Sequence, residues 1–268
     1  MAAIPRRLFR LALLLVLAVS GIVTELAVFP LISARRRRVI IRHWSRDLMS
    51  ACGLQVRVRG VGAGSLDDLA PGCMLVANHV SWLDIFAINS LATSAFVAKS
   101  ELRRWPVAGW LAALAGTVFI ERSRRHAVHR VIEQLRRRIR ERFPVAVFPE
   151  ATTTDGSALL PFYGNLLEAA IAEEAAIIPI ALRYRGVDGK PAPEAAYVGD
   201  TTFVESLWMI LGARELVVDV EVLPPVATAG RNRHDLAREL RELISARLGL
   251  EPADTAPGTV GAFRAGSR

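Results

Sequence analysis

Short apolar runs alternate with longer amphipathic segments through most of the chain. Residues 54–59 alternate apolar and polar side chains, which is typical of a half-buried strand, and the run at 74–77 is apolar throughout, which is typical of a buried strand. The same patterns predict further strands at residues 95–98, 117–120, 145–148, 177–184 and 216–223. Apolar residues at helical spacing predict helices at residues 39–51, 82–91, 107–115, 126–142, 165–175, 203–211 and 233–248. This alternation predicts a single α/β domain with a largely parallel, mixed sheet flanked by helices.

The N-terminal segment carries a long apolar stretch. No charged residue lies between Leu11 and Thr24, and the apolar character continues past Glu25 to Ile32. This length is close to what is needed to cross a bilayer core of about 30 Å. Arginines flank the stretch on both sides, which suits either a tilted membrane-spanning helix or a helix that dips into one leaflet and returns.

A cleaved signal peptide is the alternative for this segment, because Ala-Val-Ser at 18–20 resembles a small-residue cleavage site. The arginines at 35–38, 42 and 46 oppose export, so we expect the following domain to lie on the cytoplasmic face of a membrane, the inner membrane if the source is bacterial. The expected organisation is a membrane anchor over residues 1–35, one domain over 36–250, and a disordered tail over 251–268, which is rich in Pro, Gly, Ala and Thr.

Composition narrows the possible partners. The 268 residues carry a formal net charge of +8, which favours anionic partners such as phosphate head groups, a membrane surface or nucleic acid. The predicted helix at 126–142 concentrates arginines beside its apolar stripe, so it presents either a solvated face or a surface for anionic lipid. No nucleic-acid-binding module accompanies these arginines, and we expect no nucleic-acid partner. Cys52 and Cys73 lack metal-binding spacing, so we expect neither a metal site nor a disulfide framework.

Candidate chemistry begins at the end of the apolar run at 74–77. His79 and Asp84 fall on the turn between this predicted strand and the next predicted helix. Residues five apart on one helix point about 140° away from each other, so a direct contact between these two side chains needs the turn. In contact, they would form a general base and the carboxylate that orients it. The alternative is a capping box, in which Ser81 caps the helix and Asp84 reaches back to its first amides.

Polar residues also follow two later predicted strands. Arg122 follows the strand at 117–120, and Glu150 with the threonines at 152–154 follows the strand at 145–148. Because ligands bind at the carboxyl ends of parallel strands, these residues are expected to share one site with His79. Each also has a structural interpretation: Arg122 can extend the basic surface of the next helix, Glu150 can cap or pair, and Asp155-Gly156 is a turn signal.

Four blocks in this order resemble the motifs of the 1-acylglycerol-3-phosphate acyltransferase family, the lysophosphatidic acid acyltransferases and their relatives. They are Asn78-His79-x-Ser81-x-x-Asp84, Phe119-Ile120-Glu121-Arg122, Phe148-Pro149-Glu150 and Ile178-Pro179-Ile180-Ala181. The resemblance covers roughly residues 70–190, and an N-terminal membrane segment is also typical of the family. It implies transfer of a fatty acyl group from acyl-CoA or acyl carrier protein to the free hydroxyl of a lysolipid, with the donor as co-substrate and no cofactor.

The resemblance also implies roles for individual residues. His79 would be the base, and Asp84 would orient it and steady the imidazolium that forms. Arg122 and Glu150 would bind the acceptor head group together with Thr152 and Thr153, which stand in the third block. Pro179 would lie near the acyl-donor end of the site.

The third block departs from the family pattern. Phosphate-accepting members usually read Phe-Pro-Glu-Gly-Thr-Arg-Ser, whereas this chain has Ala151 in place of the glycine and Thr153 in place of the arginine. Threonine cannot supply the charge of an arginine paired with phosphate. Lysophosphatidic acid is the first-choice acceptor. Lyso-ornithine lipid, which has no phosphate, is a close second, because the Thr-Thr-Thr-Asp-Gly continuation resembles members that acylate it. A non-catalytic lipid-binding protein and a thioester or lipid-ester hydrolase are the alternatives from other classes.

Overall fold

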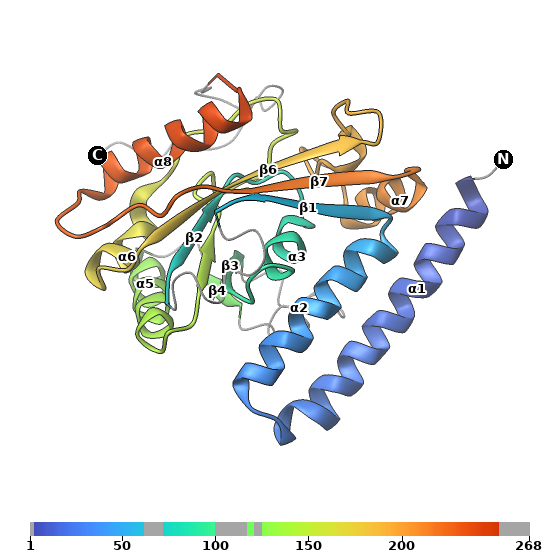
Figure 1. Ribbon diagram of the computed structural model, residues 1–268, viewed down its shortest axis with the longest axis horizontal. Helices are drawn as coiled ribbons and strands as arrows, with labels where there is room; N and C mark the ends of the chain where they lie inside the picture. The colour runs from blue at the N-terminus through green and yellow to red at the C-terminus, as the bar shows by residue number, and fades with distance from the viewer. Residues whose placement is uncertain (1–2, 62–71, 100–116, 121–124, 252–268) are drawn as a thin grey trace.

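The structure of the protein, a computed structural model, describes residues 3–61, 72–99, 117–120 and 125–251 (Figure 1). The helix predicted at 107–115 lies outside these residues, and so do most of the predicted loop at 60–72 and the tail predicted at 251–268, apart from Glu251. The remaining predicted elements fall within them and can be compared with the fold.

Seven strands among the described residues form one sheet in the order β1-β7-β6-β2-β5-β3-β4 (Figure 1). The strands are β1 (Leu54–Gly60), β2 (Met74–Ala77), β3 (Ala95–Lys99), β4 (Val118–Ile120), β5 (Val145–Val147), β6 (Ile177–Gly186) and β7 (Leu216–Val222). Every neighbouring pair is parallel except β6 and β7. The prediction of a largely parallel, mixed sheet is therefore confirmed.

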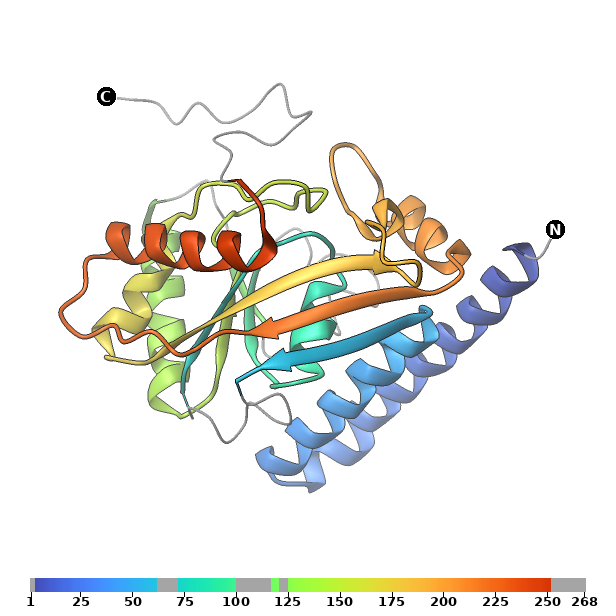
Figure 2. The same ribbon diagram turned by 45° about the horizontal axis from the view of Figure 1, so that its top comes forward.

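Helices cover both faces of the sheet, as Figure 2 shows. The helices are α1 (Ala3–Val23), α2 (Ala34–Ala51), α3 (Asp84–Asn89), α5 (Arg125–Arg140), α6 (Glu168–Ala172), α7 (Phe203–Gly212) and α8 (Arg233–Leu248). Central strand β2 is buried on both faces: Leu75 and Ala77 join a core with residues of α2, α3 and α7, while Met74 and Val76 join a second core with α5, α6 and α8. Burial on both faces explains why β2 reads as a continuous apolar run.

Three predicted helices differ from the structure. The helix predicted at 82–91 is the shorter α3, because Asp84 starts it and the residues before Asp84 form the turn. The helix predicted at 165–175 is divided into a 3-10 turn, Gly164–Leu167, and the short α6. The helix predicted at 39–51 begins earlier, at Ala34, because the Ser33 hydroxyl accepts a hydrogen bond from the amide of Arg36 at 3.4 Å and caps it.

The N-terminal segment forms a helical hairpin with α2 (Figures 1 and 2). Helix α1 (Ala3–Val23) continues through a π-helical turn, Thr24–Val28, and a 3-10 turn, Phe29–Leu31, before the chain reverses into α2. The indole N–H of Trp44 on α2 donates to the carbonyl of Leu17 on α1 at 2.9 Å. By length and composition, the helical stretch Ala3–Leu31 can cross a membrane.

The first turns of α1 also contact α7 and the residues that follow it. The Arg10 guanidinium donates to the carbonyls of Ala213 at 2.6 Å and Arg214 at 2.8 Å, just beyond the end of α7. Arg7 lies over the Trp208 ring, 4.8 Å from its centroid. Cations at the carboxyl end of a helix bind its unpaired carbonyls and complement its dipole. The arginines before the apolar stretch therefore attach α1 to α7.

Candidate active site

The turn between β2 and α3 carries His79 and is held against β6. Asn78, the first residue after β2, bonds the backbone of Leu182 twice: its Nδ2 donates to the carbonyl at 3.0 Å and its Oδ1 accepts from the amide at 2.7 Å. These two bonds replace the strand pairing that β2 gives up at Ala77. The turn is thereby attached to a rigid strand although its own backbone is irregular.

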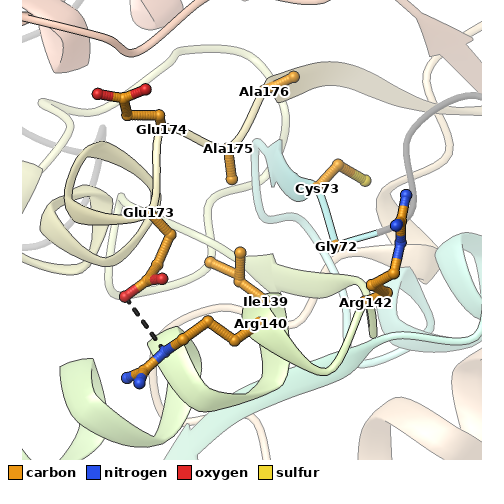
Figure 3. Close-up of a pocket in the computed structure, with 9 residues that line it drawn as sticks. All are labelled: Gly72, Cys73, Ile139, Arg140, Arg142, Glu173, Glu174, Ala175 and Ala176. Carbon is orange, nitrogen blue, oxygen red and sulfur yellow. Dashed lines mark ion pairs between the residues drawn. The ribbon is translucent and has the colours of Figure 1, made fainter.

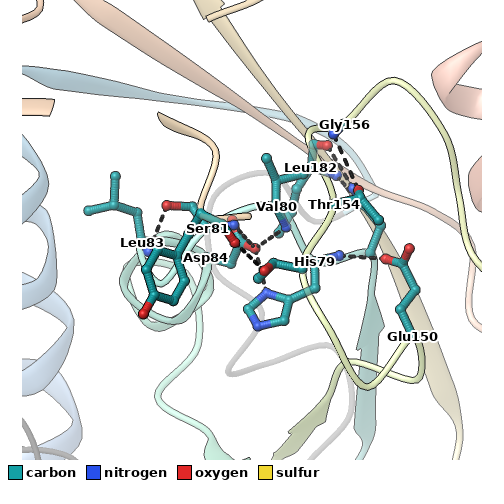
Figure 4. Close-up of polar contacts among 12 residues, drawn as sticks. His79, Val80, Ser81, Leu83, Asp84, Glu150, Thr154, Gly156 and Leu182 are labelled. Atoms are coloured by element: carbon teal, nitrogen blue, oxygen red, sulfur yellow. Dashed lines mark hydrogen bonds and ion pairs between the residues drawn. The ribbon is translucent and has the colours of Figure 1, made fainter. Parts of the chain in front are cut away.

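The predicted contact between His79 and Asp84 is present (Figure 4). Nδ1 of His79 lies 2.8 Å from Oδ2 of Asp84. The His79 side chain is 20% exposed, whereas Asp84 is fully buried. Because a carboxylate only accepts hydrogen bonds, Nδ1 donates in this contact, and in the neutral ring Nε2 then keeps its lone pair. Nε2 has no hydrogen-bond partner in the part of the chain that the structure describes.

Asp84 is held by more than His79. Oδ2 also accepts from the backbone amides of Val80 at 2.7 Å and Ser81 at 2.9 Å, and Oδ1 accepts from the Tyr184 hydroxyl at 2.6 Å. The capping-box alternative is half present, because Asp84 binds the Ser81 amide while the Ser81 hydroxyl accepts from Leu83 at 3.3 Å instead of from Asp84. One carboxylate thus fixes both the turn and the ring.

The imidazole ring is also fixed from its face. Phe148, the first residue after β5, stacks on His79 with ring centroids 4.1 Å apart and planes inclined by 10°. Phe96 stacks behind Phe148 with centroids 6.0 Å apart. The sequence identified Phe148 as part of a motif block and gave it no role. Its stacking limits the ring of His79 to the plane in which Nδ1 meets Asp84.

Glu150 binds two backbone amides, of which Figure 4 shows that of His79. Its Oε1 accepts from the amide of His79 at 2.7 Å, and its Oε2 accepts from the amide of Leu160 at 2.9 Å. The residue is 2% exposed, and this burial raises its pKa from 4.5 to about 7, against the opposing effect of the two amide hydrogen bonds. Acceptor binding by Glu150 stays a prediction, because both carboxylate oxygens are engaged in joining the His79 turn to the loop after β5.

The threonines of the third block differ in accessibility. Thr152 is exposed, whereas the Thr153 hydroxyl donates to the carbonyl of Tyr197. The next amide, of Thr154, donates to the carbonyl of His79 at 2.9 Å, so this loop lies directly against the turn. Ala151, where the family has glycine, adopts φ 60°, the left-handed region that favours glycine. Head-group binding by Thr152 and Thr153 stays a prediction.

Two further predicted site residues are Arg122 and Pro179. Arg122 falls outside the described residues. Pro179 is buried within β6, opposite Val76 of β2, and its carbonyl accepts from the amide of Leu223 at 2.9 Å. Its assignment to the acyl-donor region stays a prediction.

A cavity of about 320 Å³ lies elsewhere in the fold (Figure 3). It is lined by residues that precede β2, β5 and β6, including Cys73, Arg142 and Ala176. Arg140 and Glu173, which also line it, form an ion pair of 3.4 Å. The cavity therefore lies at the amino ends of these strands, whereas His79 follows the carboxyl end of β2. No group of three or more His, Cys, Asp or Glu that would hold a metal ion occurs among the described residues.

Comparisons with known proteins identify relatives of this chain. The model of the Acyltransferase family matches residues 59–183. Lyso-ornithine lipid O-acyltransferase from Pseudomonas aeruginosa is 36% identical over 211 residues, covering 78% of each chain. 1-Acyl-sn-glycerol-3-phosphate acyltransferase from Neisseria gonorrhoeae is 36% identical over 176 residues, covering 65% of this chain and 69% of the relative.

The fold has a solved counterpart. The crystal structure of the 1-acyl-sn-glycerophosphate acyltransferase from Thermotoga maritima matches with a TM-score of 0.64 and 22% sequence identity, covering 91% of this chain and 96% of that one. The sequence relatives establish an enzyme that transfers an acyl group to a lysolipid in a membrane-associated setting. The chain belongs to the acyltransferase family that contains the 1-acyl-sn-glycerol-3-phosphate and lyso-ornithine lipid acyltransferases.

Proposed function

We propose that His79 is the general base of the acyl transfer and that Asp84 orients it. Nε2 of His79 takes the proton of the acceptor hydroxyl as the hydroxyl oxygen attacks the thioester carbonyl carbon. The new C–O bond forms a tetrahedral intermediate, the C–S bond then breaks, and the imidazolium returns the proton to the departing thiolate. Asp84 balances the positive charge on the ring between these steps. The single observation that carries this role is the 2.8 Å contact between Nδ1 and Asp84, which leaves Nε2 as a base.

The acceptor that the site supports best is lyso-ornithine lipid. The position where phosphate-accepting members have arginine is Thr153, and its hydroxyl already donates to the Tyr197 carbonyl. It therefore offers a phosphate neither a positive charge nor a free donor. Several similar sequences, from Pseudomonas aeruginosa and Rhizobium meliloti among others, bear the name lyso-ornithine lipid O-acyltransferase.

Lysophosphatidic acid is the competing acceptor. The similar sequences from Neisseria carry the name 1-acyl-sn-glycerol-3-phosphate acyltransferase at the same 36% identity. Arg122 of the second block would supply the charge for the phosphate in this case. The two acceptors differ in net charge, so a transfer assay with each of them can show which one the enzyme prefers.

The remaining partners follow from the same reaction. The donor is acyl-CoA or acyl carrier protein, and the reaction needs no added cofactor because the thioester is already activated. The α1–α2 hairpin exposes apolar side chains such as Leu8, Leu15 and Val19 beside a helix with six arginines, which suits an anionic membrane surface. We place the catalytic domain on the cytoplasmic face of that membrane.

A transfer assay tests the proposal. Purified enzyme in lipid vesicles receives a labelled acyl donor and, separately, lyso-ornithine lipid or lysophosphatidic acid. We expect transfer to lyso-ornithine lipid to dominate, and His79→Ala to lower it by about a thousandfold or more. His129→Ala, on the exposed face of α5, serves as the matched control and should keep full activity.

Three outcomes would contradict the proposal. Undiminished transfer by His79→Ala would remove His79 as the base. A preference for lysophosphatidic acid by the unaltered enzyme would favour the competing acceptor. Release of free fatty acid at the same rate without any acceptor would indicate a hydrolase.

Thr153→Arg should shift the ratio of the transfer rates to the two acceptors towards lysophosphatidic acid. An unchanged ratio would show that Thr153 does not determine the choice of acceptor.

A further inference from the structure

Strand β6 continues past the end of its neighbour β2 and lies along the catalytic turn. The last pair between the two strands joins Ala77 to Ile180, whereas β6 runs on to Gly186. Two residues beyond that pair, Leu182 bonds the Asn78 side chain, and two residues further still is Tyr184. Since alternate residues of a strand point to the same face, Leu182 and Tyr184 both join the core that contains α3.

The Tyr184 hydroxyl reaches the carboxylate that holds the catalytic ring. It donates to Oδ1 of Asp84 at 2.6 Å. The other oxygen, Oδ2, has three donors, which are His79 Nδ1 and the amides of Val80 and Ser81. Among the described residues, Tyr184 alone donates to Oδ1. Without it, one oxygen of a fully buried carboxylate would lack a partner.

We propose that Tyr184 is a positioning residue that fixes the Asp84 carboxylate and, through it, the ring of His79. This rests on the role of His79 proposed above. Tyr184 belongs to none of the four motif blocks, and no contact with substrate is assigned to it. Its action passes entirely through Asp84.

Burial and charge agree with this role. Tyr184 is 6% exposed, and burial, with the nearby Asp84 carboxylate, raises the pKa of its hydroxyl well above the usual 10. The hydroxyl therefore remains a donor at any pH at which the enzyme works. The other titratable groups around this pair are His79, the buried Cys52 on the α2 side, and Glu150 across the turn. Donation to Oδ1 also draws negative charge away from the oxygen that faces His79.

Tyr184→Phe tests the inference, because it removes the hydroxyl and keeps the ring that packs in the core. We expect kcat with lyso-ornithine lipid to fall about 10- to 100-fold, as for a lost hydrogen bond to a charged group, with KM changed less than about threefold. The acid limb of the pH–rate profile should move to higher pH, because Asp84 then stabilises the imidazolium more strongly. Tyr163→Phe is the matched control, since its side chain is exposed and it should change neither quantity.

A double substitution separates positioning from general stabilisation. In an Asp84→Ala background, Tyr184→Phe should cause no further loss, because its only route to the ring is gone. An equal loss in both backgrounds would overturn the inference, and so would a kcat of Tyr184→Phe within twofold of the unaltered enzyme.

A spectroscopic measurement keeps the inference independent of the proposed base. NMR titration of labelled histidine, with His79→Ala to assign the signal, should show the His79 midpoint moved upward in Tyr184→Phe. An unmoved midpoint contradicts the positioning role whatever the activity. A moved midpoint together with an active His79→Ala enzyme would instead refute the proposed function and leave the positioning intact.

Discussion

Two buried carboxylates hold His79 from opposite sides, and they do so differently. Asp84 contacts the imidazole ring itself and has four donors, one of them the side chain of Tyr184. Glu150 contacts the backbone amide of His79, and its two hydrogen-bond donors found among the described residues are both backbone amides. The effect of each carboxylate depends on the atom of His79 that it binds. Asp84 binds Nδ1 and so sets the tautomer of the ring, whereas Glu150 binds the backbone amide and so fixes the position of the His79 backbone.

The largest effect is expected for Asp84→Asn. With its oxygen in the place of Oδ2, asparagine would still accept from the amides of Val80 and Ser81 and from Nδ1, but it would lack the negative charge that balances the imidazolium. We expect kcat to fall by about 10³- to 10⁴-fold with little change in KM, which steady-state transfer assays would measure. Asp235→Asn, at an exposed position on α8, is the control. Near-normal kcat in Asp84→Asn would show that the negative charge of Asp84 does not support the base.

Glu150→Gln should have a smaller effect on rate and a distinctive effect on stability. The pKa of Glu150 lies at about 7 in the folded protein and near 4.5 in the unfolded chain, so between these values the folded state holds a proton that the unfolded state has released. Its contribution to stability is therefore fully present below pH 4.5 and is lost as the pH rises through 7, by as much as about 3 kcal/mol.

Thermal unfolding from pH 4.5 to 8 measures this dependence. Glutamine does not titrate, so the decline should be flatter in Glu150→Gln than in the unaltered protein. One glutamine oxygen can replace only one of the two amide contacts, so kcat should also fall by about tenfold. Glu194→Gln, at an exposed site, should keep the original slope. Parallel stability curves for Glu150→Gln and the unaltered protein would exclude Glu150 as the titrating group.

The smallest effect is expected at the residue after Glu150. Ala151 has φ 60°, which costs an L-residue about 1–2 kcal/mol, whereas glycine adopts it freely but loses more entropy on folding. Ala151→Gly should therefore raise stability by no more than about 1 kcal/mol and leave kcat within about twofold. A thermal midpoint that falls, measured beside the unaltered protein, would show that the methyl group of Ala151 makes a compensating contact.

Much of the fold could be predicted because each pattern reflects a local cause. The continuous apolar run of β2 follows from burial on both faces, and the alternation of β1 follows from burial on one. The start of α2 at Ala34 was missed because the arginines that follow it have no apolar spacing, although Ser33 is a good capping residue. The division of the 165–175 segment depends on contacts that periodicity does not report.

The site could be predicted less completely for a related reason. His79 and Asp84 lie five residues apart, so the turn between strand and helix was enough to suggest their contact. Tyr184 and Asp84 are a hundred positions apart, and only the register of β6 against β2 brings them together. One signal was available: a tyrosine in an otherwise buried strand needs a partner for its hydroxyl. The sequence did not indicate which partner.

The sequence by itself determined the alternation of strands and helices and the contact between His79 and Asp84 on the turn, because these depend on neighbours along the chain. Tertiary structure alone decided the arrangement around that pair. It placed Phe148 against the face of the ring, Glu150 on the backbone of His79, and Tyr184 on the second oxygen of Asp84. The physical reason is that the order of strands in the sheet sets distances between residues that the chain itself keeps far apart.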